Sequence, residues 1–192
     1  LQPAPDRQRF IVVAQRVSAM TLDGGTLELS GVDVDYNRAF TVDGGGTIAV
    51  DTGVTGTVSG GVSGFGTLTK SGAGTLALTG NNTYSGDIRI DAGTLTVAAG
   101  GTLDGTSTVT DNGTLVVDGV GSNVNGNVSV GDGGTGSLLV SNGGSVFTSG
   151  DMNIGNLVGD SGTVMVTHGA SLNVLYSINI GQYGIGNMTI AD

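Results

Sequence analysis

The sequence of 192 residues contains no cysteine and no tryptophan, and only 2 prolines. The absence of cysteine excludes a disulfide framework and a thiolate metal site. The scarcity of proline and the lack of a Gly-X-Y period exclude collagen. Aromatic residues make up 4 % of the chain, which leaves little material for stacking on nucleic-acid bases. Charged residues make up 11 %, against about 25 % in an average domain.

Basic residues are few and lie only in the first half of the chain. The formal net charge is −10, so a phosphate backbone would repel the chain and we expect no nucleic-acid partner. No lysine or arginine follows Arg89, whereas eight aspartates do: Asp91, Asp104, Asp111, Asp118, Asp132, Asp151, Asp160 and Asp192. These aspartates either keep the surface soluble and mutually repulsive, which is the simpler interpretation, or bind Ca²⁺ or a basic partner.

The pattern of the polar residues does not indicate a metal or cofactor site. The Gly- and Asp-rich stretch at 131–136 does not follow the order of the tandem nonapeptides that bind Ca²⁺. His168 is the only histidine, and without cysteine or a second histidine it cannot form a zinc site. We interpret His168 as a turn residue, and we predict neither a cofactor nor a metal.

Long apolar runs are also missing. No stretch of about 18 apolar residues occurs, so we expect no direct membrane insertion of this chain. The sequence has no signal peptide, and its last repeat stops within a coil, so we expect a fragment of a longer array. The segment 1–20 contains both prolines and no glycine, and we predict that it is a leader, a first coil or a cap.

Glycine, in contrast, is abundant, with 38 residues in the chain. It recurs in a Gly-Thr-apolar unit that opens a short run with an apolar residue at every second place. Such alternation, rich in threonine and valine, predicts β-strands, and the glycines supply the turns between them. The unit occurs at 25–27, 46–48, 56–58, 66–68, 74–76, 93–95, 101–103, 113–115 and 162–164.

The C-terminal third repeats more strictly. Val130-Gly131 aligns with Ile154-Gly155 and Ile180-Gly181, at spacings of 24 and 26 residues. A second run follows in each copy and begins at Gly136, Gly162 and Gly186. About three short strands therefore fill each period.

This period predicts an all-β fold, a parallel β-helix or β-solenoid. Each coil would stack about 4.8 Å from the next and bury an apolar ladder. At 22 to 25 residues per coil, we expect about seven or eight coils in residues 21–192. A β-sandwich also needs many short strands, but its varied loops would not produce this self-similarity.

One stretch carries a family resemblance. Residues 66–86, Gly-Thr-Leu-Thr-Lys-Ser-Gly-Ala-Gly-Thr-Leu-Ala-Leu-Thr-Gly-Asn-Asn-Thr-Tyr-Ser-Gly, are followed by Ile90-Asp91-Ala92-Gly93-Thr94-Leu95. The pattern G-x-L-x-K-x-G-x-G-x-L-x-L-x-G-x-N-x-Y-x-G closely resembles the passenger-associated repeat of bacterial autotransporters. The later copies resemble a second repeat type of the same secreted proteins, so the resemblance covers roughly residues 64–192.

The resemblance implies a right-handed β-helix that is exported by type V secretion through a C-terminal β-barrel, which this sequence lacks. It implies a place on the surface of a Gram-negative bacterium or outside it. Many such passengers are adhesins that act in virulence. We therefore expect adhesion, autoaggregation or host-cell binding, with a host cell-surface or extracellular-matrix component, or the protein itself, as partner. A passive stalk or secretion scaffold that presents another domain is the alternative.

A polysaccharide-active enzyme is the second alternative, because pectin-degrading enzymes use β-helices. Asp33 and Asp35 lie two residues apart and would share one side of a strand, opposite Val32, Val34 and Tyr36. We interpret them as an exposed strand face, and Lys70 as part of the repeat. Asn81 and Asn82 are predicted to form a turn in left-handed conformation. We expect no enzymatic activity and assign no catalytic residues, and the sequence does not identify the binding residues.

Overall fold

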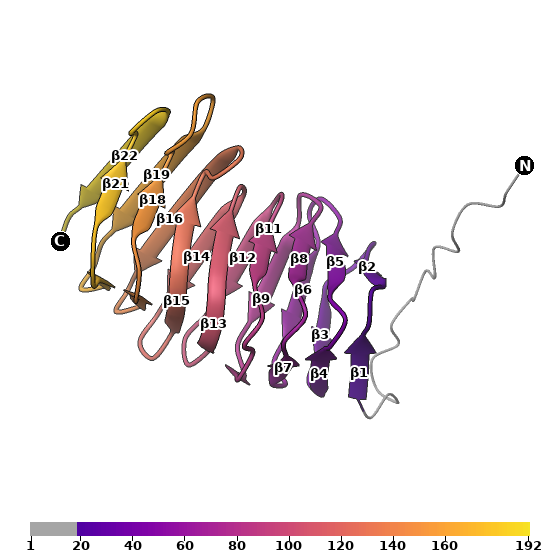
Figure 1. Cartoon of the computed structure of the whole chain (residues 1–192). Helices are drawn as coiled ribbons and strands as arrows, with labels where there is room; N and C mark the ends of the chain where they lie inside the picture. Colours follow the sequence, from indigo (N-terminus) through magenta and orange to yellow (C-terminus); the bar gives the residue numbers. More distant parts are fainter. Residues whose placement is uncertain (1–18) are drawn as a thin grey trace, which may run out of the picture.

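The computed structural model describes residues 19–192, except for the side chains of residues 106 and 107. All regular structure in this range is β, and no helix there is long and apolar enough to cross a membrane. Residues 1–18 of the predicted leader lie outside the described residues, and the first strand, β1, begins at Ala19. The strands wind into coils that stack on one another in the order of the sequence (Figure 1).

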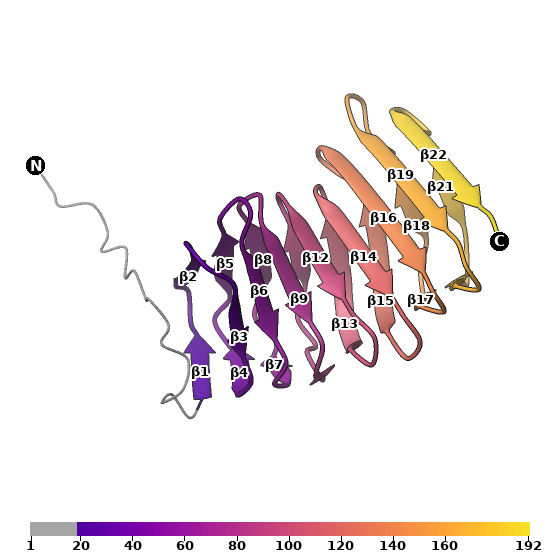
Figure 2. The same cartoon turned by 180° about the vertical axis from the view of Figure 1, so that it is seen from behind.

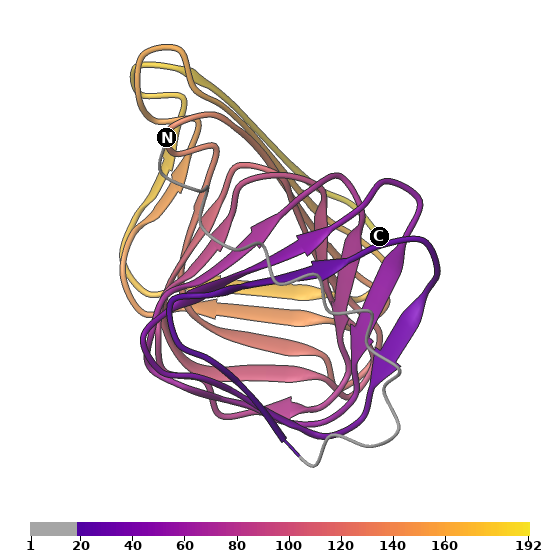
Figure 3. The same cartoon turned by 90° about the vertical axis from the view of Figure 1, so that its right-hand side faces the viewer.

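The coils form a three-sided parallel β-solenoid, as predicted. Every strand pair is parallel, and strands of successive coils are neighbours in each sheet. Each of the three faces has one strand from each of eight coils. Seen along the stack, the coils overlie one another around a common interior (Figure 3).

The first two faces share two long strands that run through a corner. The first face contains β1 (Ala19–Leu22), β4 (Ala39–Val42), β7 (Val62–Gly64), β10 (Asn81–Asn82), the starts of β13 (Thr102–Asp111) and β15 (Asn123–Val130), β17 (Ser145–Thr148) and β20 (Ser171–Val174). The second contains β2 (Thr26–Leu29), β5 (Gly46–Val50), β8 (Leu68–Ser71), β11 (Ile88–Ile90), the ends of β13 and β15, β18 (Met152–Ile154) and β21 (Ile178–Ile180).

The third face is one continuous eight-stranded sheet. It contains β3 (Val34–Tyr36), β6 (Thr55–Val58), β9 (Thr75–Leu78), β12 (Thr94–Val97), β14 (Thr114–Asp118), β16 (Thr135–Ser141), β19 (Ser161–Val166) and β22 (Ile185–Ile190). Seen from behind, these strands lie side by side across the molecule (Figure 2).

Alternation along each strand builds the core. Inward residues of consecutive coils stack in register, as in the ladder of Leu76, Leu95, Leu115, Leu138 and Val164, all fully buried. Burial of each such side chain contributes about 1.5–3 kcal/mol before entropy is counted. Since no coil can bury this ladder alone, stacking of the coils stabilises the fold.

Stacked glycines form one corner of the C-terminal coils. Gly131, Gly155 and Gly181 have φ of 65°, 58° and 61°, in the left-handed region that favours glycine. A Cβ at Gly162 would lie 2.4 Å from the Val130 carbonyl oxygen and 2.5 Å from the Gly155 nitrogen. The predicted equivalence of the C-terminal copies is confirmed, because Val130 pairs with Ile154 and Ile154 with Ile180.

Three sequence-based expectations need correction. The coil length varies more than predicted, from 19 residues between Thr75 and Thr94 to 26 between Ser145 and Ser171. Val32 does not share the inward side with Tyr36. It is 71 % exposed, because it lies in the bend before β3 begins.

The prediction of a left-handed turn at Asn81 and Asn82 is also wrong. They form β10, where Asn81 is exposed and Asn82 is fully buried. The turn interpretation of His168 is confirmed, because its φ is 53°.

Candidate functional site

The third face carries a row of polar side chains that crosses seven coils, six of them with a hydroxyl group and the last with the amide of Asn187. The outward side chains of the third face align in register from β6 to β22, and we call the residues that carry them the threonine face. The first column contains Thr55, Thr75, Thr94, Thr114, Ser137, Thr163 and Asn187. Neighbouring strands lie about 4.8 Å apart, so the row is about 29 Å long.

A second column of the threonine face lies two residues further along each strand and is mostly apolar. It contains Thr57, Ala77, Thr96, Val116, Leu139, Met165 and Thr189. Met165 is 42 % exposed, and Val116 and Leu139 are half-buried, as on an open sheet surface. The face therefore offers a hydroxyl ladder beside an apolar stripe.

Charge is almost absent from the threonine face. From β6 to β22 its strands contain one charged residue, Asp118 at the end of β14. The Asp118 carboxylate accepts hydrogen bonds from Ser141 Oγ at 2.6 Å and from Asn142 Nδ2 at 2.7 Å. Among the described residues, no protein group bonds to a hydroxyl of the first column, so these hydroxyls are left for solvent or a partner.

On the other two faces, several outward polar groups also bond to each other between coils. On the first face Asn123 Nδ2 donates to Asp104 at 3.1 Å, and Ser171 Oγ lies 3.0 Å from Ser145 Oγ. On the second face Asn179 Nδ2 donates to Asn153 Oδ1 at 2.9 Å. The second face also carries the exposed ion pair between Arg89 and Asp91.

The C-terminal aspartates act mainly within the protein. Six of the eight bond to other groups of the chain: Asp91, Asp104, Asp111, Asp118, Asp151 and Asp160. Asp160, for example, accepts from the Gly133 and Leu157 amides at 3.1 and 3.3 Å and ties two loops together. These six carboxylates therefore have hydrogen-bonding roles within the fold, which the sequence analysis did not predict.

Lys70 lies inside the solenoid, because it follows Leu68 on the inward side of β8. It is fully buried, and its Nζ donates to the carbonyl oxygens of Ser71, Gly72 and Ala92 at 2.9, 2.8 and 3.1 Å. Ala92 belongs to the next coil, so the ammonium group joins two coils. Burial lowers the pKa of Lys70 from 10.5 to about 8.

Asn82 bonds to the coils on both sides of its own. Its Oδ1 accepts from the Val62 amide at 2.8 Å, and its Nδ2 donates to the carbonyl oxygens of Gly80 and Thr102 at 2.9 and 2.8 Å. The asparagine thereby supplies bonds that the short strand β10 does not make with its backbone.

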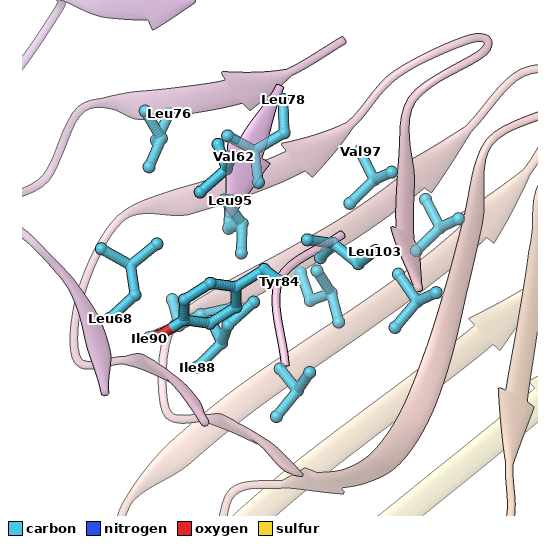
Figure 4. Close-up of a cluster of buried hydrophobic side chains, with 14 of the residues drawn as sticks. Val62, Leu68, Leu76, Leu78, Tyr84, Ile88, Ile90, Leu95, Val97 and Leu103 are labelled. Carbon is cyan, nitrogen blue, oxygen red and sulfur yellow. The ribbon is translucent and has the colours of Figure 1, made fainter. Parts of the chain in front are cut away.

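Tyr84 completes this set of buried polar residues. Its ring packs among Leu68, Ile88 and Ile90 (Figure 4). Its hydroxyl donates to the Gly66 carbonyl oxygen in the neighbouring coil, and burial raises its pKa to about 12. Sequence reasoning recognised Lys70, Asn82 and Tyr84 as repeat positions but missed that they brace the coils from inside.

Asp111 is a second buried ionisable group on the ladder of Lys70, with Ile90 between them in register. It is fully buried, and its Oδ1 accepts from the Gly113 amide at 3.0 Å. Its Oδ2 has no partner among the described residues. Burial raises the pKa of Asp111 from 3.8 to about 7.

Asp33 and Asp35, the carboxylates considered for an enzyme, are exposed at the first coil of the third face. Each accepts a hydrogen bond from the second coil, Asp33 from the Thr55 amide and Asp35 from Ser59 Oγ, both at 2.7 Å. In the structure they connect coils 1 and 2. Among the described residues, no cluster of three or more His, Cys, Asp or Glu side chains could hold a metal ion.

The passenger-associated-transport-repeat family model matches the chain twice, over residues 22–50 and 68–97. The second match confirms the stretch that carried the resemblance. The first match was missed, because it keeps the Gly-Thr-apolar units at 25–27 and 46–48 but has no lysine and no Asn-Asn pair. No curated protein and no solved structure matches the chain. With its two passenger-associated transport repeats in a parallel β-solenoid, the chain fits an autotransporter passenger domain with repeats.

Proposed function

We propose that this passenger acts in adhesion, through an extended lateral face that binds a host cell-surface or extracellular-matrix component or another bacterium. The observation that supports this proposal is the threonine face. It presents unbonded hydroxyls and apolar side chains over seven coils, with one charged residue in its strands.

An extended ladder suits adhesion for a physical reason. Each hydroxyl or methyl contact contributes little, but the register repeats the same contacts in coil after coil. Many copies on one cell then bind together, and the combined avidity exceeds that of one copy by orders of magnitude. Weak single contacts are therefore sufficient for the proposed function.

The test is to display the chain on a non-adherent bacterium and measure two properties. We expect the cells to settle from suspension, or to adhere to matrix-coated plates or host cells, more than cells without the chain. If displayed cells neither settle nor adhere, adhesion is not the function. Labelling of intact cells with an antibody checks that the chain is on the surface, which is also the location we propose for the native passenger.

A passive stalk is the second candidate, and the uninterrupted coil stacking supports it. Inward ladders continue from coil to coil, so the solenoid can hold another domain away from the membrane. The two candidates differ in their sensitivity to single outward substitutions. If the chain is a stalk, Val116→Asp on the threonine face has no effect on binding, and an unrelated spacer of equal length can replace the chain. If the face is adhesive, Val116→Asp weakens binding, and the spacer does not restore it.

We propose further that the passenger binds and does not catalyse. The hydrogen bonds of Asp33 and Asp35 to the second coil support a structural role for both carboxylates. The test is a screen of the chain on uronate polymers, with Asp33→Asn and Asp35→Asn variants as controls. Hydrolysis that disappears in these variants would establish the enzyme alternative.

A further inference from the structure

We propose that the first face carries a binding site for a neutral sugar, built by the Phe147 ring and the side-chain amides of Asn125 and Asn173. These three residues form one outward column that runs through coils 6, 7 and 8. The site lies on a different face from the threonine face, so the inference goes beyond the proposed adhesive function and does not depend on it.

Phe147 is an aromatic residue on the outside of the solenoid. It lies in β17 between Val146 and Thr148, which are both fully buried, so its side chain points outward. The ring is partly exposed and does not belong to the core cluster. The other two aromatic residues in the described strands, Tyr36 and Phe40, are buried and pack edge to face inside. Core packing therefore does not explain the position of Phe147.

Two asparagines flank the ring along the stack. Asn125 in the preceding coil and Asn173 in the following coil are the register partners of Phe147, each about 4.8 Å away at the spacing of the strands. Both side chains are exposed, and no group among the described residues bonds to either amide. Each amide offers two N–H donors and one carbonyl acceptor.

The outward hydroxyls on the two other sides of the ring already have partners. Ser145 Oγ, two residues before Phe147, lies 3.0 Å from Ser171 Oγ. Ser149 Oγ, two residues after Phe147, donates to Asn127 Oδ1 at 3.3 Å. The ring is therefore edged by bonded hydroxyls on two sides and by the two unbonded amides on the others.

A pyranose fits this arrangement, because it has an apolar face of C–H groups and a rim of hydroxyls. The C–H groups stack on the negative face of the aromatic ring, and the hydroxyls bond to the amides. A sugar chain that lies along the stack contacts Asn125, Phe147 and Asn173 in turn. A protein partner needs a fully desolvated apolar centre, which a single ring among polar groups does not supply.

The charges of the chain favour a neutral sugar. The strands β15, β17 and β20 contain no charged residue, and no lysine or arginine follows Arg89. A sulfate or carboxylate group would therefore find no cationic partner there, and it would approach a chain with a net charge of −10. Uncharged hexose or N-acetylhexosamine units avoid this repulsion.

Saturation-transfer NMR of the 192-residue chain tests the site. The probes are oligosaccharides of glucose, galactose and N-acetylglucosamine, with heparin fragments as the acidic probe. We expect transfer to the C–H protons of at least one neutral probe and none to heparin. The sugar that binds should also shift the side-chain amide signals of Asn125 and Asn173. Absence of transfer to every neutral probe, or equal binding of heparin, would overturn the proposal.

Substitutions locate the contact by titration with the sugar that binds. Phe147→Ala should weaken binding by about tenfold or more, whereas Phe147→Tyr keeps the ring and should stay within about twofold. Asn125→Ala and Asn173→Ala should each weaken binding by about two- to tenfold, the loss typical of one hydrogen bond. Thr110→Asp, on the second face, is the matched control and should bind as the wild type does. Circular dichroism checks that each variant folds.

The outcomes separate this site from the threonine face. Full binding by Phe147→Ala, with loss of binding in Val116→Asp, would place the sugar on the threonine face and overturn the proposal. If Phe147→Ala reduces adherence to protein-coated plates and no neutral probe binds, the ring serves a protein partner and the sugar assignment is wrong. If the chain binds a sugar through Phe147 while displayed cells neither settle nor adhere, the sugar site stands and the adhesive function fails.

Discussion

Replacing Lys70 by methionine tests whether the lysine of the repeat is a buried brace. Lys70 is the only lysine of the chain, so no other lysine titration obscures it. Its pKa is 10.5 in an ordinary environment and about 8 in the folded protein, because burial disfavours the charged form. Methionine keeps a similar length and apolar stem but carries no proton that titrates.

The sign of the effect follows from proton linkage. Between pH 8 and 10.5 the unfolded chain holds a proton on Lys70 that the folded chain has lost, so the wild-type protein gains stability as the pH rises. At about 1.4 kcal/mol for each tenfold change in proton affinity, the gain is about 3 kcal/mol. The Lys70→Met protein lacks this gain.

The assay is urea unfolding of both proteins at several pH values between 7 and 11. The difference in free energy of unfolding, wild type minus Lys70→Met, should rise by about 3 kcal/mol across this range. Tyrosine titrations, including that of Tyr84, occur in both proteins and cancel in the difference. A difference that stays constant with pH would refute the reasoning, since Lys70 would then have the same pKa in both states.

Three other substitutions test the buried polar groups and the corner glycines, each by chemical unfolding. Asn82→Leu removes the partners of the Val62 amide and the Thr102 carbonyl, and it should cost about 2–4 kcal/mol. A cost below about 0.5 kcal/mol would mean that water replaces the asparagine. Asp111 has a folded-state pKa of about 7, above 3.8, so its contribution is full below pH 4 and is lost as the pH rises toward 7. Asp111→Asn should therefore gain about 4 kcal/mol relative to the wild type between pH 4 and pH 8, and equal pH profiles would contradict the burial of its carboxyl group. Gly162→Ala places a Cβ 2.4 Å from the Val130 carbonyl oxygen and should cost more than the roughly 1 kcal/mol typical of point mutations. Gly25→Ala, with open space at its Cβ and no positive φ, is the matched control without the clash.

The regular part of the fold was predictable because its signals are local. Alternation in Thr75–Leu78 and Thr94–Val97 identified strands, and the repeat of Val130, Ile154 and Ile180 identified the stacking. The coil lengths were not predictable, because insertions such as the loop between β18 and β19 change the spacing of the strands without changing their register.

The buried polar residues could have been recognised from the same alternation. Lys70 follows Leu68 at a distance of two, and Asp111 follows Val109, so both occupy inward positions. Their polarity favoured an exposed location, and only the structure shows which carbonyl or amide groups receive them. The threonine face required the register of seven coils at once, which unequal coil lengths hid in the sequence.

The most direct measurement of the central claim compares the settling of bacteria that display the wild-type chain, Val116→Asp or Thr110→Asp at equal surface density. If the threonine face is the adhesive surface, wild-type and Thr110→Asp cells settle at the same rate and Val116→Asp cells stay in suspension. Equal settling of all three would contradict the assignment of adhesion to this face.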